Sequence, residues 1–177
     1  LPNHTCMLTG RPVGNTNLPP TAGHGVTINE DPGAPATVHS LGNTNLAYIP
    51  CIFDVAHDAG LSTALYTSKD KFALYDRSWN ATNGALDGDA AAGDNGRDKI
   101  DAYFMNQSST GGRTPASKAY TLLYGNGGAI PGLLADLASH QWNLVFLHIT
   151  DPDPCGHTYG WNSPTWSNAL LDVDDYL

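Results

Sequence analysis

The sequence predicts an α/β fold, with a largely parallel central sheet flanked by helices. Residues 144–149 form a run of strand length that is apolar apart from His148 and ends abruptly in Asp, Pro and Gly. Such a run is typical of a strand buried on both faces in a parallel sheet. Residues 52–60 indicate an amphipathic helix closed by Gly60, and residues 61–67 a strand, which together make a helix–strand unit. A second predicted helix, at 130–140, leads into the 144–149 strand.

The two ends of the chain predict further helices. Residues 1–10 have Pro2 in the first turn and Gly10 at the end, as helices prefer. Residues 163–177 begin with Ser163 as a cap and are expected to form the last helix. Between these ends, residues 11–21 and 30–45 are rich in turn formers and predict surface loops.

The middle of the chain is less regular. Phe72, Tyr75 and Trp79 recur at near-helical spacing, which favours packing over ligand stacking. Residues 80–98 predict a loop whose Asp and Gly residues lack the spacing of an EF-hand calcium loop. Residues 99–105 predict a strand and residues 107–117 a polar linker. In the predicted 130–140 helix, Leu133, Leu134 and Leu137 are expected to pack on the sheet. Five polar residues of other helices are expected to face solvent: His57, Asp58, Asp172, Asp174 and Asp175.

Composition narrows the possible partners. The 177 residues suit one domain with a sizeable core, and no apolar run approaches the length needed to cross a membrane. Eight Lys and Arg against 17 Asp and Glu give a formal charge of −9, which argues against binding of a nucleic-acid duplex. The negative charge does not exclude a small phosphate ester as substrate, because bound metal ions reverse the local electrostatic field. The three widely spaced cysteines predict no disulfide framework and no zinc ribbon.

The residues after the 144–149 strand carry potential metal ligands. Asp153 and His157 are four positions apart, and Pro154 and Gly156 between them predict a tight turn. Ligands in α/β sheets collect at the carboxyl ends of strands, and a carboxylate oxygen with an imidazole nitrogen suits zinc or a similar divalent ion. The alternative is ordinary turn chemistry, since Asp-Pro and Gly are common in loops.

Three further polar residues stand at the ends of predicted segments. Asn29 ends the segment 24–29, where the residues alone favour a strand-end turn residue. Lys69 and Lys71 follow the 61–67 strand and either face an anionic substrate or lie in a solvated loop.

Three segments resemble one family. Residues 152–160, Pro-Asp-Pro-Cys-Gly-His-Thr-Tyr-Gly, resemble the P-D-x-x-G-H-x-x-G signature of the alkaline phosphatase superfamily in its type I phosphodiesterase/nucleotide pyrophosphatase branch. Residues 24–29, His-Gly-Val-Thr-Ile-Asn, resemble that branch's H-G-I-x-x-N. Residues 1–10 resemble its nucleophile helix, T-[FL]-P-N-H-x-x-x-x-T-G, through Leu1, Pro2, Asn3, His4, Thr9 and Gly10. The resemblance implies an alkaline-phosphatase-like α/β fold.

The resemblance also implies a site. It assigns two divalent metal ions, with zinc the expected ion, and makes Asp153 and His157 ligands of one of them. It gives Asn29 the role of donating to a phosphoryl oxygen. Its nucleophile, a Thr or Ser, falls immediately before Leu1, and the remaining ligands fall outside the chain. Thr5 and Thr9 are the alternative hydroxyls, but hydroxyls within a helix commonly bond back to carbonyls.

The resemblance implies a metal-dependent phosphoric ester hydrolase, a phosphodiesterase or nucleotide pyrophosphatase that forms a phosphoenzyme. Residues 1–177 are then expected to be a single partial catalytic domain, truncated at both ends and inactive alone. The compartment is little constrained, and a periplasmic or extracellular one is favoured. The alternatives are a phosphomonoesterase, a sulfatase, or a non-catalytic α/β binding module with a degenerate metal loop. A sulfatase would carry C/S-x-P-x-R, which the sequence lacks.

Overall fold

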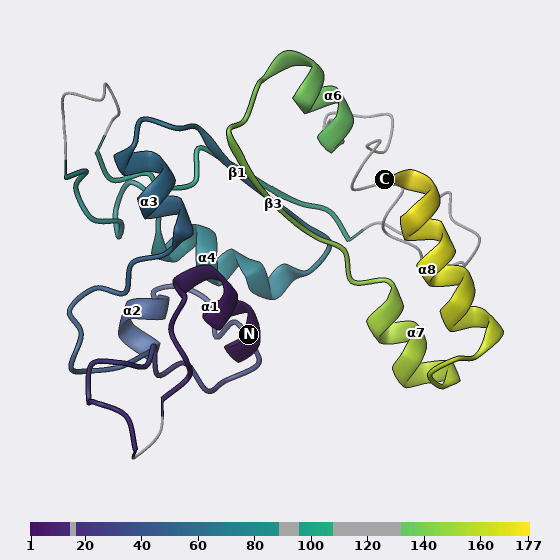
Figure 1. The fold of residues 1–177 in the computed structure, drawn as a ribbon, viewed down its shortest axis with the longest axis horizontal. Coiled ribbons are helices and arrows are strands. Elements are labelled where there is room, and N and C mark those ends of the chain that lie inside the picture. The colour runs from purple at the N-terminus through teal and green to yellow at the C-terminus, as the bar shows by residue number, and fades with distance from the viewer. Residues whose placement is uncertain (15–16, 89–95, 108–131) are drawn as a thin grey trace. The chain divides into compact units, whose positions relative to one another are not determined.

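The computed structural model describes residues 1–14, 17–88, 96–107 and 132–177. Its elements in chain order are α1 (Pro2–Thr9), α2 (Val38–Leu41), α3 (Ile52–Asp58), β1 (Thr63–Thr67), the 3₁₀ helix η1 (Asp70–Phe72), α4 (Ala73–Ser78), β2 (Ala102–Met105), α6 (Leu133–Ser139), β3 (Leu144–His148), α7 (Pro152–Tyr159) and α8 (Pro164–Tyr176) (Figure 1). The predicted helices at 1–10, 52–60, 130–140 and 163–177 are all present within a few residues of their expected bounds.

The described strands form one parallel three-stranded sheet in the order β2-β1-β3, which confirms the α/β prediction. Figure 1 shows β1 and β3 side by side. All five residues of β1 are buried, whereas all five of β3 are only half-buried. The prediction that the strand at 144–149 is buried on both faces was therefore wrong. Within the described sheet β1 has a neighbour on each side and β3 has one, so β1 is the enclosed strand.

The chain divides into two compact units: residues 1–64, 71–103 and 142–144 form the first, and residues 65–70, 104–141 and 145–177 the second. An aromatic row forms the centre of the first unit. Phe72 meets Tyr75 edge-on at 5.0 Å between ring centroids, and Tyr75 stacks on Trp79 at 5.7 Å. All three rings are fully buried, which confirms that their spacing reflects packing. The Trp79 indole N–H donates to the Ile49 carbonyl at 3.1 Å, so its polar atom is satisfied.

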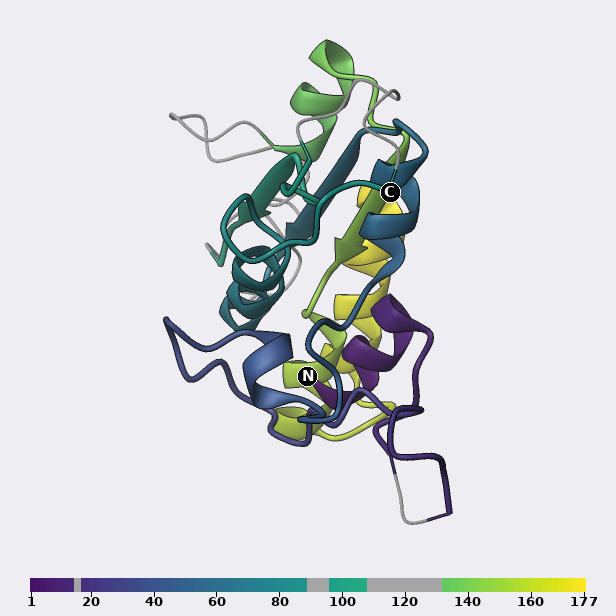
Figure 2. The ribbon, with the colours of Figure 1, turned by 90° about the vertical axis from the view of Figure 1, so that its left-hand side faces the viewer.

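Short helices surround this row. Helix α1 contacts α3, and α2 contacts α4 (Figure 2). Helix α2 lies inside the region 30–45 that was predicted to be a loop. A capping box starts it: the Thr37 hydroxyl accepts from the Ser40 N–H at 3.1 Å, and the Ser40 hydroxyl accepts from the Thr37 N–H at 2.9 Å. Ser40 stands where that motif usually has Glu or Gln, so the sequence did not indicate that a helix starts here.

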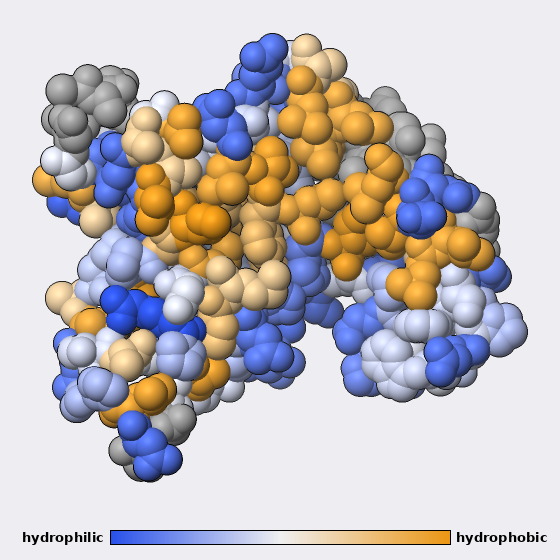
Figure 3. Space-filling model, viewed as in Figure 1, coloured by the Kyte–Doolittle hydropathy of each residue, from blue (hydrophilic) through white to orange (hydrophobic). Residues whose placement is uncertain are grey.

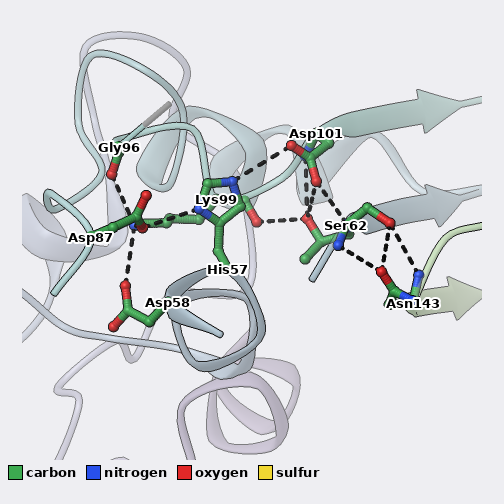
Figure 4. Close-up of polar contacts among 9 residues, drawn as sticks. His57, Asp58, Ser62, Asp87, Gly96, Lys99, Asp101 and Asn143 are labelled. Atoms are coloured by element: carbon green, nitrogen blue, oxygen red, sulfur yellow. Dashed lines mark hydrogen bonds and ion pairs between the residues drawn. The ribbon is translucent and has the colours of Figure 1, made fainter. Parts of the chain in front are cut away.

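A buried charge cluster ties the polar segment after α4 to α3 (Figure 4). The Lys99 ammonium contacts the Asp87 carboxylate and donates to the Gly96 carbonyl at 2.9 Å. The Lys99 and Asp87 side chains are 1% and 3% exposed. His57 Nδ1 lies 3.1 Å from the same carboxylate, and its side chain is fully buried. The prediction that His57 is solvated was wrong, because α3 turns this residue inward; the neighbouring Asp58 side chain is 47% exposed.

Helix α6, in the second unit, presents an unexpected face inward. Leu133 and Asp136 are buried, whereas Leu134 and Leu137 are about two-fifths exposed (Figure 3 shows the apolar surface over this helix). The Tyr66 hydroxyl donates to the Asp136 carboxylate. Positions three apart share a helix face, so this hydrogen bond directs Leu133 inward and turns the other two leucines outward. The predicted packing of Leu134 and Leu137 on the sheet was wrong.

Helices α7 and α8 lie side by side in the same unit (Figure 1). The Ser163 hydroxyl accepts from the Trp166 N–H at 3.2 Å, so the predicted cap of α8 is confirmed. Asp172, predicted to be solvated, is buried. In the parts of the chain that the structure describes, no helix has the length and apolar character needed to cross a membrane.

We expect Lys99→Met to destabilise the protein by about 3–5 kcal/mol, because it leaves the buried Asp87 carboxylate without its cation. Adding Asp87→Asn should recover part of the loss. Asp58→Asn, at the exposed rim of the cluster, is the control and should cost less than about 1 kcal/mol. Urea unfolding measures all three, and equal losses in Lys99→Met and Asp58→Asn would contradict the assignment of Lys99 as the buried partner.

The Asp87 carboxylate also predicts a dependence of stability on pH. Burial raises its pKa, but hydrogen bonds from Lys99 and His57 outweigh burial and lower the pKa to about 2. An unfolded Asp titrates near pH 4. The contribution is therefore present above about pH 4 and is lost as the pH falls towards 2. Unfolding free energies measured across this window should fall less steeply in Asp87→Asn than in the parent chain.

Candidate functional site

Asn29 lies at the start of α1. Its side-chain oxygen accepts from the backbone nitrogen of Leu1 at 2.5 Å and from the Lys71 ammonium at 2.9 Å. The side chain is exposed, and it borders a hollow of about 380 Å³ lined by Ile28, Asn29, Glu30 and Pro32. The first-turn N–H groups of a helix have no acceptor within the helix, and they form the positive end of its dipole. This end of the first unit therefore combines an amide, an ammonium group and a helix N-terminus.

Buried contacts hold the first turn of α1 in place. The Tyr75 hydroxyl donates to the Leu1 carbonyl at 3.1 Å and lies 3.1 Å from the Thr5 hydroxyl. Burial raises the pKa of Tyr75, so its hydroxyl keeps its proton. The Thr5 and Thr9 hydroxyls donate to the carbonyls of Leu1 and Thr5 at 3.1 and 2.6 Å. Both threonines therefore bond back to the helix, as expected, and neither side chain is presented as a nucleophile.

Two histidines, His4 in α1 and His24 beside it, make structural contacts. His24 is buried; its Nδ1 accepts from the Val26 N–H at 3.0 Å, and its Nε2 lies 3.2 Å from the Cys6 sulfur. Burial lowers the pKa of His24, which favours the neutral ring that Nδ1 needs in order to accept. The His4 ring meets Phe72 edge-on at 5.0 Å between centroids.

Asp153 and His157 lie on a helix, which corrects the prediction of a tight turn. Both belong to α7, and both point to solvent. The Asp153 side chain is 69% exposed and the His157 side chain is 71% exposed. A separation of four residues is about one helical turn, so the two side chains share a face. His157 Nε2 lies 3.5 Å from Asp153 Oδ1. Pro152 and Pro154 fit in α7 because first-turn N–H groups need no helical acceptor.

This pair has the spacing of two ligands on one metal ion. Bonds of about 2.1 Å at a tetrahedral angle set ligand atoms about 3.4 Å apart, close to the observed separation. A carboxylate oxygen and an imidazole nitrogen are also suitable zinc donors. Outside the undescribed stretches 15–16, 89–95 and 108–131, no cluster of three or more His, Cys, Asp or Glu could hold a metal ion. The neighbouring Cys155 is buried, and burial raises the pKa of its thiol, so it packs as an apolar residue.

Gly156 allows an aromatic ring to pack on α7. A Cβ atom at this position would lie 2.3 Å from the Trp161 ring. The same ring meets His157 edge-on at 5.4 Å between centroids, and it meets Trp166 of α8 at 6.2 Å. Trp161 thus supports the imidazole of the proposed ligand pair, and the glycine of the motif provides the space for it.

The site residues are distributed over both units. Leu1, Asn29 and Lys71 belong to the first unit, whereas Asp153 and His157 belong to the second. Because the carboxyl ends of strands in an α/β sheet share one rim, we predict that these groups lie at that rim. Sequence reasoning left Lys71 undecided between a substrate contact and a solvated loop, and its pairing with Asn29, 42 positions away, had no signal in the sequence.

Gly156→Ala tests the packing under His157. We expect a loss of about 1–3 kcal/mol in unfolding free energy, because the added methyl group overlaps the Trp161 ring. In a Trp161→Ala background the same change should instead stabilise the protein, by up to about 1 kcal/mol, because alanine favours a helix over glycine. Urea unfolding of the parent chain, the two single variants and the double variant gives the change in unfolding free energy in each background. The same sign in both backgrounds would contradict the proposed overlap.

The comparisons with known proteins agree with the motifs. The family model described as type I phosphodiesterase / nucleotide pyrophosphatase matches residues 1–177. No curated protein and no solved structure gives a significant match. The family match covers the whole chain, including α1, Asn29 and α7. The chain belongs to the type I phosphodiesterase/nucleotide pyrophosphatase family, a branch of the alkaline phosphatase superfamily.

Proposed function

We propose that this chain is the part of a metal-dependent phosphodiesterase or nucleotide pyrophosphatase that binds a phosphoryl group and one metal ion. Family membership supports a phosphoric ester hydrolase. The observation that carries the finer proposal is the position of Asn29 at the N-terminus of α1, where its oxygen is engaged by Leu1 and Lys71. The substrate is a small phosphate ester.

The role of Asn29 follows from its chemistry. An amide nitrogen donates a hydrogen bond to a phosphoryl oxygen as negative charge develops on it, which is a common way to stabilise such a transition state. The N-terminus of α1 favours the same negative charge through its dipole. Removal of one such donor typically costs about 10²–10³ in kcat.

Asp153 and His157 are the proposed ligands of one divalent ion. Their spacing and donor types fit zinc, and further ligands come from residues outside the pair. When bound, such ions act as Lewis acids towards phosphoryl oxygens. Within the chain, Trp161 orients the imidazole of His157. In this proposal the nucleophile is a Thr or Ser before Leu1 and forms a covalent phosphoenzyme.

Two alternatives differ in measurable ways. A phosphomonoesterase or a sulfatase of the same superfamily would use related metal chemistry on a different ester. A non-catalytic binding module would hold an anion or a metal ion without turnover. The residue before Leu1 distinguishes the binding module from the enzymes: Thr or Ser there supports an enzyme, and Ala or Val supports a module.

The decisive assay uses the protein that includes the residue before Leu1, supplied with zinc. We expect bis-p-nitrophenyl phosphate to be cleaved faster than p-nitrophenyl phosphate or p-nitrophenyl sulfate. Asn29→Ala should lower kcat by roughly 10²–10³ and change KM less, because it removes a donor that acts in the transition state. The matched control is Asn45→Ala, which removes an exposed amide from a loop and should keep full activity.

Four outcomes would contradict the proposal or its metal assignment. Faster turnover of the sulfate ester would identify a sulfatase, and preference for the monoester a phosphomonoesterase. Absence of turnover with an Ala or Val before Leu1 would favour the binding module. The double variant Asp153→Asn, His157→Ala should lose zinc affinity by calorimetry, and unchanged affinity would remove the metal assignment.

A further inference from the structure

The side chain of Lys71 is bonded to the candidate phosphoryl donor. Its ammonium nitrogen lies 2.9 Å from the Asn29 side-chain oxygen. Lys71 sits in η1, directly before Phe72, which is fully buried. Phe72 packs edge-on against His4 of α1 and against Tyr75, each at 5.0 Å between centroids. These ring contacts hold the backbone that carries Lys71 against α1, so the ammonium group starts from a well-supported position.

The chemistry of this contact determines which way the amide of Asn29 faces. An ammonium group donates hydrogen bonds and accepts none. The backbone nitrogen of Leu1, on the same oxygen, is also a donor. Both neighbours therefore require the amide oxygen, and the amide nitrogen must face the other way. Within the described ranges, the Asn29 nitrogen donates to no other protein group, so it is available for a ligand.

The surroundings give this orientation a consequence. The hollow beside Asn29 is also lined by Glu30, whose carboxylate repels an anion. If the amide reversed, its oxygen would add a second repulsive group on that side. Lys71 opposes both the repulsion from Glu30 and a reversal of the Asn29 amide. Its positive charge holds the amide oxygen in place, and it also polarises the amide, which strengthens the N–H donors.

We propose that Lys71 is a positioning residue: it orients the Asn29 amide so that the nitrogen donates to the phosphoryl oxygen of the substrate. This inference rests on the proposed function. Lys71 acts through Asn29 and has no direct contact with the substrate.

A double-mutant cycle tests this role in the protein that includes the residue before Leu1, with bis-p-nitrophenyl phosphate as the probe. Lys71→Met should lower kcat at least about tenfold and leave KM nearly unchanged, because orientation of a transition-state donor is lost. Lys71→Arg retains a donor and should restore most of the activity. In an Asn29→Ala background, Lys71→Met should add less than about twofold, since coupled residues are non-additive. Lys69→Met removes the same charge two positions away and should have a smaller effect.

Several results would overturn the role. If the Lys71→Met and Asn29→Ala effects multiply and KM rises, Lys71 binds the substrate itself. If Lys71→Met lowers kcat only in proportion to a large drop in urea stability, the residue is merely structural. If Lys69→Met and Lys71→Met are equally damaging, general charge and not orientation is responsible.

A spectroscopic measurement separates this inference from the proposed function. In ¹⁵N-labelled protein without substrate, Lys71→Met should shift the Asn29 side-chain amide resonances, Lys71→Arg should shift them less, and the Asn45 resonances should stay in place. Unchanged Asn29 resonances in Lys71→Met would overturn the pairing whatever the activity. Shifted resonances in a protein that cleaves no diester would support the pairing and overturn the proposed function.

Discussion

The hydrogen bond from the Tyr75 hydroxyl to the Leu1 carbonyl is the contact on which the first unit's candidate site depends. The carbonyl also accepts from the N–H and hydroxyl of Thr5, so the first turn of α1 is closed by buried, satisfied polar groups. Tyr75 belongs to the same aromatic row as Phe72 and Trp79. One short segment, η1 with α4, therefore supplies both the apolar support under α1 and the lysine that meets Asn29.

The two units use different means to place their polar residues. In the first unit, Lys99 and Asp87 form a buried ion pair that His57 also contacts, because an isolated buried charge is costly. In the second unit, the Tyr66 ring stacks on Phe104 at 4.8 Å while its hydroxyl bonds to Asp136. A single aromatic side chain thus fills space and also orients a helix.

Much of the fold could be predicted from the sequence, because apolar periodicity and breakers are local signals. They located β1, β3 and the helices at both ends. The predictions that were wrong concern features set by residues that are distant in sequence but close in space, which local patterns cannot show. The burial of β3 follows from its place in the sheet, the inward turn of His57 from the distant Asp87, and the face of α6 from Tyr66. At the candidate site, Asp153, His157 and Asn29 were recognisable from motifs, but α7 was expected to be a turn because Pro and Gly dominate it. The role of Gly156 becomes clear only with Trp161 in contact.

The helical setting of Asp153 and His157 has a thermodynamic consequence. Two ligands on a flexible loop must lose conformational freedom when they close on an ion, and this ordering weakens binding. On α7 the backbone is ordered by helical hydrogen bonds, and the ring of Trp161 restricts the imidazole of His157. In the proposed metal site, the entropy loss on ion binding would be confined mainly to the side-chain torsions of Asp153. The helix therefore gives the proposed ligand pair an ordered backbone before any ion binds.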